Sequence, residues 1–232
     1  MSVDCIFLAA GEGTRTGLMY PKQFHPVYGK PLMIYPLSVL QEMWEIKHIW
    51  VAANPDYLQN TEEALQRYKI SKAKIVPGGS SRQISVFNCL DNVTTKRVII
   101  QPASRPHISA GFIRRLLDAD GELVTPVEKP VYSLFFRMGS LPGAGYHLAR
   151  EEVSVLHCPQ LLPTQLLIDA HRHAQAEQLY QFPEDFSLIA WYLNSVKLKK
   201  VYNQVFVTNP GENQKVTYSG DLLQLGDVLN EN

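Results

Sequence analysis

The residues best suited to chemistry lie near the start of the chain, in a glycine-rich loop that also carries cations. The loop is Ala9-Ala10-Gly11-Glu12-Gly13-Thr14-Arg15-Thr16-Gly17, and Pro21-Lys22-Gln23-Phe24 follows it. Glycines let the backbone turn tightly, so that amide N–H groups can point at phosphate oxygens. Because the loop lacks the Gly-Lys-Ser/Thr ending of a Walker A loop and the spacing of a dinucleotide-binding loop, the pattern alone indicates either a phosphate site or a structural turn.

A short buried strand is expected to position this loop. Cys5-Ile6-Phe7-Leu8-Ala9-Ala10 is a continuous apolar run of the kind found in parallel sheets. Strands and helical stretches then alternate. The further strands are expected at His48–Ala53, Ala73–Val76, Arg97–Ile100, Glu122–Val127 and near Lys199–Thr208. The helices are expected at Pro31–Met43, Asp56–Tyr68, Ser80–Asn92, Ser109–Leu117, Thr164–Gln178, Phe186–Asn194 and Ser219–Leu229, with Ser80 and Ser109 as N-caps.

This alternation predicts the α/β class, with a single Rossmann-like domain over residues 1–232. We expect a mostly parallel, twisted sheet flanked by helices on both faces. In such a sheet ligands bind beyond the carboxyl ends of the strands, which is where the glycine-rich loop lies. Between about 129 and 155 the periodicity is lost, and this stretch predicts a protruding β-arm with Gly139–Gly145 as its turn.

Composition limits the classes of partner. Lys plus Arg and Asp plus Glu are equal at 22 each, so no overall charge draws the chain to nucleic acid or to a membrane. No apolar run approaches the length of a membrane span, and no signal-peptide pattern is present. Cys5, Cys89 and Cys158 are widely spaced, which argues against a zinc site and for free thiols. We expect a cytoplasmic protein.

The first loop resembles the opening signature AAGxGxRx…PKQ(F/Y) of the 2-C-methyl-D-erythritol 4-phosphate and ribitol-5-phosphate cytidylyltransferases. Further segments resemble this family in the same order along nearly the whole chain. They are Gly78-Gly79-Ser80-Ser81-Arg82-Gln83-Ile84-Ser85-Val86, Gln101-Pro102-Ala103-Ser104-Arg105-Pro106, Thr125-Pro126-Val127, Arg150 with Pro159-Gln160, and Asn213-Gln214-Lys215-Val216-Thr217 with Asp221-Leu222. Six segments in register are far more specific than any one of them.

The resemblance implies a CTP-dependent enzyme, in which a phosphate oxygen of the acceptor attacks the α-phosphorus of CTP and pyrophosphate leaves. Arg15, Lys22 and Lys215 match the family's catalytic cations, which act by positioning and charge stabilisation. Mg²⁺ is implied as a cofactor, although no residue is assigned as its ligand. The nucleotide-binding positions implied are Ala9, Ala10, Gly11, Glu12, Gly13, Gly78, Gly79, Arg82 and Ser85.

The match weakens on the acceptor side. Pro102 replaces the family's aspartate, and Lys129-Pro130-Val131-Tyr132 replaces DTxK in the arm. Arg105 and Arg150 remain as implied acceptor-binding residues, and because the family supplies the second from a neighbouring arm, a homodimer is implied. We therefore predict transfer of CMP from CTP to a small phosphorylated polyol or phosphonate, with the hypothesis that methylerythritol phosphate is not the acceptor.

Several alternatives remain open. Pro102 is also compatible with an inactive paralogue that acts as a nucleotide-binding or regulatory dimer, and another base is not excluded. Glu184, Asp185 or a water could replace the lost carboxylate near a metal. His171 and His173 are interpreted as solvated, and Phe135-Phe136 as either core or interface.

Overall fold

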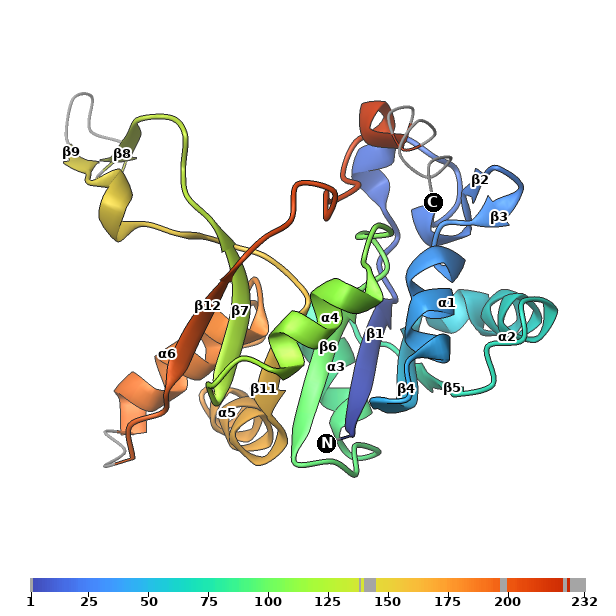
Figure 1. Cartoon of the computed structure of the whole chain (residues 1–232), viewed down its shortest axis with the longest axis horizontal. Helices are drawn as coiled ribbons and strands as arrows, with labels where there is room; N and C mark the ends of the chain where they lie inside the picture. Colours follow the sequence, from blue (N-terminus) through green and yellow to red (C-terminus); the bar gives the residue numbers. More distant parts are fainter. Residues whose placement is uncertain (1, 138, 140–144, 197–199, 223–224, 226–232) are drawn as a thin grey trace.

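The centre of the molecule is an eight-stranded mixed sheet. The computed structural model describes residues 2–137, 139, 145–196, 200–222 and 225. Its sheet has the strand order β10-β7-β11-β6-β1-β4-β5, and β12 pairs with β7 (Figure 1). The strands are β1 (Val3–Ala9), β4 (Ile46–Ala53), β5 (Ala73–Pro77), β6 (Arg97–Pro102), β7 (Leu123–Glu128), β10 (Val155–Leu156), β11 (Gln160–Pro163) and β12 (Gln204–Thr208). The predicted Rossmann-like α/β fold is confirmed.

The parallel part of the sheet determines where the loops meet. β1 pairs in parallel with β4 and with β6, so that Ile6 lies between Trp50 and Ile100, and β5 pairs in parallel with β4. β11 runs antiparallel between β6 and β7, whereas β12 is parallel to β7. The carboxyl ends of β1, β4, β5 and β6 therefore lie along one edge of the sheet, where ligands bind in open α/β folds.

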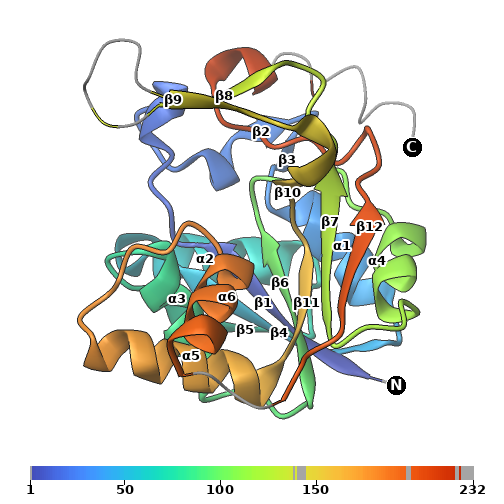
Figure 2. The ribbon, with the colours of Figure 1, turned by 90° about the vertical axis from the view of Figure 1, so that its left-hand side faces the viewer.

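Helices cover both faces of the sheet. Apolar side chains of each strand point alternately to the two faces, so both faces must be covered. Phe7 of β1 packs in one apolar cluster with α1 (Ile34–Glu42), α2 (Leu58–Arg67) and α4 (Ala110–Leu117). Its neighbour Ile6 belongs to the opposite cluster with α3 (Arg82–Leu90), α5 (Thr164–Ala176) and α6 (Asp185–Val196). Figure 2 shows α3, α5 and α6 on one side of the sheet and α1 and α4 on the other.

Some boundaries differ from the sequence predictions. Helix α1 begins only at Ile34, because Pro31 lies in β3 (Lys30–Pro31), which pairs with β2 (Pro26–Val27). A short 3-10 helix, Pro55–Tyr57, precedes α2. The N-cap of α3 is Ser81 and not Ser80, since the Ser81 side chain accepts a hydrogen bond from the Ile84 amide. Ser109 caps α4 as predicted.

The predicted arm is present as a hairpin. β8 (Leu134–Arg137) and β9 (Gly145–Leu148) pair antiparallel, apart from the main sheet, and project away from it in Figure 1. Most of the predicted turn Gly139–Gly145 lies outside the described residues. Phe135 and Phe136 are 58% and 49% exposed, which excludes a core role in the single chain. The dimerisation role of the arm stays a prediction.

The C-terminal region follows the predicted order of elements. Strand β12 begins at Gln204, later than predicted, while residues 219–222 and 225 are helical and the rest of the predicted last helix lies outside the described residues. In the described part of the chain, no helix is both long and apolar enough to cross a membrane.

Candidate active site

A cleft of about 940 Å³ opens at the carboxyl edge of the parallel strands. Almost all of the predicted site residues line it, although they come from distant parts of the chain. We call residues 9–13 with 78–81 and 85 its glycine half. We call Arg82 with residues 102–105, 156–160 and 183–184, together with their buried partner Asp185, its network half. The predicted residues in the cleft are Ala9, Ala10, Gly11, Glu12, Gly13, Arg15, Lys22, Gly78, Gly79, Arg82, Ser85, Arg105 and Lys215.

The first loop is fixed by contacts with the segment that follows it. Gly13 has φ +73°, and a Cβ there would meet the Lys22 backbone N at 3.2 Å, so only glycine suits this position. The buried Gln23 side chain donates from Nε2 to the Ala9 carbonyl at 2.6 Å. Sequence reasoning noticed Gln23 only as part of a motif. In the structure it is the residue that anchors the end of β1.

Three cations from opposite ends of the chain meet in the cleft. Lys22 Nζ donates to the Val216 carbonyl at 2.7 Å, which brings it beside Lys215. Burial, followed by the charges of Lys215 and Arg15, lowers the pKa of Lys22 to about 8. Burial and the nearby Arg105 also lower the pKa of Lys215. Like charges held together in a cleft disfavour one another, so the arrangement is suited to a polyanion.

The glycine half depends on backbone groups that approach closely. The Gly78 amide donates to the Ala53 carbonyl at 2.7 Å, and a Cβ at Gly78 would clash with Ala10. The Gly79 amide donates to Ser85 Oγ at 3.0 Å, so these two predicted nucleotide-binding residues contact each other. Side chains larger than glycine therefore do not fit at Gly78 or Gly79.

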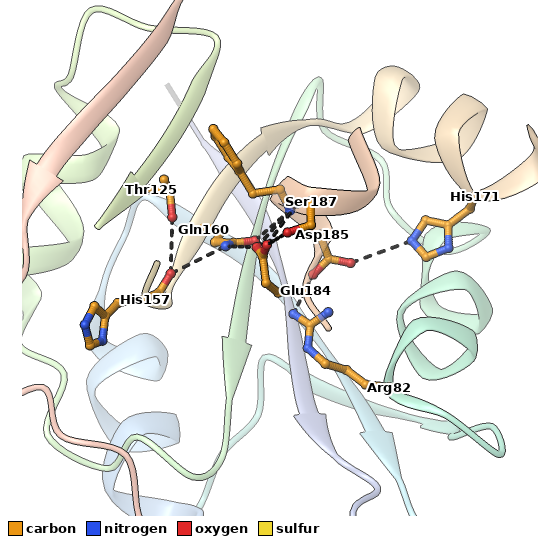
Figure 3. A network of polar contacts seen from close by, with 9 residues as sticks. Arg82, Thr125, His157, Gln160, His171, Glu184, Asp185 and Ser187 are labelled. Carbon is orange, nitrogen blue, oxygen red and sulfur yellow. Dashed lines mark hydrogen bonds and ion pairs between the residues drawn. The ribbon is translucent and has the colours of Figure 1, made fainter. Parts of the chain in front are cut away.

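Arg82 reaches the cleft from a buried ion-pair network, shown in Figure 3. Its Nη2 lies 2.5 Å from Asp185 Oδ2, and Asp185 Oδ1 lies 3.7 Å from His171 Nε2. Burial opposes the charge of Asp185, but Arg82 and His171 hold its pKa at about 2. The prediction that His171 is solvated was wrong, because its phase on α5 turns it inward to stack on Phe87.

Glu184 is also committed to the protein. Its carboxylate accepts hydrogen bonds from Gln160 Nε2, from the amides of Phe186 and Ser187, and from the Ser187 hydroxyl (Figure 3). These contacts fix the start of α6 against β11. Neither Glu184 nor Asp185 therefore has a carboxylate that is free of protein partners to replace the one missing at Pro102.

Arg105 does not present its guanidinium to the cleft as an open acceptor site. The residue is only 6% exposed, and it donates to the Asn213 carbonyl and to His157 Nδ1. The buried Gln101 holds the Arg105 backbone by donating to its carbonyl at 3.1 Å. His157 and Asn213 are thus site residues whose roles sequence reasoning missed, since partners so far apart in the chain leave no local pattern.

Arg150 is not brought to the cleft of its own chain. It lies in the short 3-10 helix Arg150–Glu152 at the end of the arm, where Nη1 donates to the Val131 carbonyl at 3.2 Å. Its place on a projecting arm leaves it available to a neighbouring molecule.

The donor set of the cleft does not make a magnesium site from protein groups alone. Among the described residues there is no cluster of three or more His, Cys, Asp or Glu side chains that could hold a metal ion. Glu12 also lines the cleft with a carboxylate, but Pro102 offers no side-chain ligand. A metal at this site would depend on ligands supplied by the substrate.

Both the sequence and the fold of this chain match known proteins. The family model for 2-C-methyl-D-erythritol 4-phosphate cytidylyltransferase matches residues 3–230. The chain belongs to this family. A family member from Halalkalibacterium halodurans is 30% identical, with 100% of this chain and 98% of the relative covered. One from Chlamydia pneumoniae is 32% identical over 75% of this chain and 78% of its own.

Solved structures show the same fold. A 4-diphosphocytidyl-2C-methyl-D-erythritol synthase from Anaerococcus prevotii superposes with a TM-score of 0.82 at 19% identity, covering 99% of this chain and 96% of its own. The 2-C-methyl-D-erythritol 4-phosphate cytidylyltransferase from Thermus thermophilus gives 0.73 at 23%, covering 99% and 100%. Membership of the cytidylyltransferase family assigns the chain to the CTP-dependent nucleotidyltransferases.

Proposed function

We propose that this protein transfers CMP from CTP to a small polyol phosphate and releases pyrophosphate. The observation that carries the proposal is the convergence of Arg15, Lys22 and Lys215 on one cleft beside a glycine-rich loop. The printed names of the relatives make 2-C-methyl-D-erythritol 4-phosphate the first acceptor to test. Mg²⁺ is proposed to arrive with the triphosphate, which supplies the oxygen ligands that the cleft lacks.

The chemistry follows from the charges. An oxygen of the acceptor phosphate forms a bond to the α-phosphorus of CTP while the bond to the bridging oxygen of the β-phosphate breaks, and its electron pair leaves with pyrophosphate. Arg15, Lys22 and Lys215 stabilise the negative charge that gathers on the α-phosphate and the leaving group. The glycine half holds the base and the start of the triphosphate, since its backbone forms a close-packed wall of the cleft at Gly78 and Gly79.

A second candidate acceptor is favoured by Pro102, which lines the cleft where the family has a carboxylate. A less hydroxylated acceptor, such as a phosphonate, needs that carboxylate less. Neither of the nearby acidic residues substitutes freely, because Asp185 pairs with Arg82 and Glu184 caps α6. This candidate keeps the same donor and reaction and changes only the acceptor.

Pyrophosphate release tests both candidates. The protein is incubated with each of the four nucleoside triphosphates, Mg²⁺ and a panel of methylerythritol phosphate, other polyol phosphates and short phosphonates. We expect release with CTP and one acceptor class, and loss of release in Lys22→Ala. Lys47→Ala should release as much pyrophosphate as the wild type, because Lys47 lies outside the cleft and donates to Thr94. Turnover of methylerythritol phosphate at ordinary enzyme rates eliminates the second candidate.

The arm supports a proposed homodimer in which Arg150 serves the neighbouring cleft. Arg150→Ala and Lys22→Ala subunits are each expected to be inactive as homodimers. After mixing and subunit exchange, mixed dimers carry one intact cleft facing one intact arm, so about a quarter of the wild-type site activity returns. Failure to recover activity in confirmed mixed dimers contradicts the sharing of Arg150.

A further inference from the structure

The Arg105 guanidinium is engaged on two sides. Nη1 donates to the carbonyl of Asn213, and Nη2 lies 2.8 Å from Nδ1 of His157. Burial lowers the pKa of Arg105, but the group still carries only donors. It therefore needs an acceptor at each end, and an imidazole nitrogen meets this need only when it bears no proton.

His157 is itself fixed against β7. Its amide donates to the Pro126 carbonyl at 2.8 Å, and its carbonyl accepts from Thr125 Oγ1 at 3.2 Å. Since Nδ1 accepts from Arg105, the proton of the neutral ring is on Nε2, which faces Glu128 Oε2 at 3.3 Å. Glu128 is the last residue of β7, where the chain leaves the sheet for the arm.

The other end of this chain of contacts leads to Lys215. Asn213 is fully buried, and its side-chain amide donates to the carbonyl of Cys158 and to Asn209, both at 2.7 Å. The backbone is held again directly after Lys215, because the Val216 amide donates to the Ser104 carbonyl at 2.8 Å. Lys215 thus lies between two anchored points, and Arg105 fixes the first of them.

We propose that His157 is a positioning residue whose unprotonated Nδ1 holds Arg105, and through Asn213 holds Lys215, in the geometry needed for nucleotidyl transfer. Glu128 fixes the tautomer from the root of the arm. Protonation of His157 places an N–H against the guanidinium, so the contact opens and the first of the two anchors of Lys215 is weakened. This role rests on the proposed function, because Lys215 is the cation that it serves.

The charges around His157 support a neutral ring at neutral pH. Arg105 and Lys215 oppose its protonation, and Glu128 favours it. Burial and then Arg105 lower the pKa of His157 below its usual range, even with Glu128 nearby. The contact is therefore expected to persist at neutral pH and to open only in acid, on the acid side of an unperturbed histidine.

Two variants separate positioning from mere packing. His157→Asn puts a carbonyl oxygen near the place of Nδ1, so it can still accept from Arg105 but cannot be protonated, whereas His157→Leu removes the acceptor. We expect His157→Leu to lose at least about 10-fold in kcat with the KM for CTP changed by less than about 3-fold. We expect His157→Asn to recover most of kcat and to lose the acid limb of the pH profile that His157 causes.

The tautomer is measured independently of turnover by NMR of ¹⁵N-labelled histidine. We expect His157 to be in the Nε2–H form. We also expect the pKa of His157 to rise in Arg105→Lys, because the shorter lysine side chain does not reach Nδ1. An Nδ1–H tautomer, or an unchanged acid limb in folded His157→Asn, overturns the inference while the wild type remains active. An inactive wild type with every acceptor instead defeats the proposed function, and the NMR result still decides the His157 contact.

Discussion

The two halves of the cleft are built in different ways. In the glycine half, backbone atoms touch backbone atoms, as where the Gly78 amide meets the Ala53 carbonyl. In the network half, buried charged and polar side chains bind one another, as Arg105 does with His157. The first half offers a shape that short sequence motifs encode. The second offers a set of long-range pairings, in which changing one residue leaves its partner unsatisfied.

The largest effect is expected where the halves meet, at Lys215. Lys215→Ala removes a cation that we place at the α-phosphate, and kcat/KM for CTP should fall about 10³-fold. The measurement is pyrophosphate release under single-turnover conditions, with Lys47→Ala as the matched control because its ammonium lies outside the cleft and donates to Thr94. A loss below tenfold would mean that the two halves do not share this cation.

The glycine half should fail through its shape. A Cβ at Gly78 clashes with Ala10 and comes within 3.1 Å of the Ala53 carbonyl, so Gly78→Ala must displace the first loop. We expect the dissociation constant of CTP, measured by calorimetry, to rise about 100-fold. Gly111→Ala on α4 is the control, because nothing lies within 4 Å of its added methyl group. Equal affinities of Gly78→Ala and Gly111→Ala for CTP would show that close packing at Gly78 does not shape the nucleotide site.

The network half should fail through lost partners. Asp185→Asn leaves Arg82 without its buried carboxylate, so the free energy of unfolding should fall by about 3 kcal/mol and CTP affinity by about 10-fold. Asp169→Asn, which alters a partly exposed carboxylate on α5 that accepts from Gln165, is the control. Chemical denaturation and calorimetry measure the two effects.

The same variant has a pH signature with a defined sign. The folded pKa of Asp185 is held at about 2, below the unfolded value. Its stabilisation is therefore complete above the unfolded pKa, near 3.9, and is lost as pH falls toward 2. The difference in unfolding free energy between wild type and Asp185→Asn should shrink over that window, and a constant difference would show that the carboxylate charge is not the cause.

The smallest effect concerns the acceptor. Pro102→Asp restores the carboxylate of the family beside several cations of the cleft. If methylerythritol phosphate is the acceptor, kcat/KM for it should rise about 3-fold, while the KM for CTP stays unchanged. Pro102→Asn is the neutral control of similar size. A gain in both variants would point to backbone freedom, and a loss only in Pro102→Asp would favour an acceptor with fewer hydroxyls.

The sequence predicts the glycine half of the cleft better than the network half. Continuous apolar runs such as that of β1 predicted the parallel strands and the edge where the cleft opens, and the glycine motifs predicted its lining. The contact of Arg82 with Asp185, 103 residues away, left no local signal. The inward position of His171 was available in the pattern, since Leu167, Ala170 and Ala174 share its helix face, but an isolated histidine pair suggested solvent.

Arg105 shows why the remaining roles could not be predicted. A motif match states that an arginine is present, but not which groups claim its five donors. In this chain a histidine 52 residues away and a backbone carbonyl near the end of the chain bind them. The direction in which a long side chain points depends on the complete fold.

The hydrogen bond from Lys22 to the Val216 carbonyl joins groups 194 residues apart. Chains emerge from the ribosome with the N-terminal part first, so the glycine-rich loop is exposed long before its partner segment exists. Until residue 216 has been synthesised, Lys22 lacks this backbone anchor. Lys215 is added to the chain only immediately before it. A chain that ends before this segment lacks both Lys215 and the Val216 carbonyl that anchors Lys22.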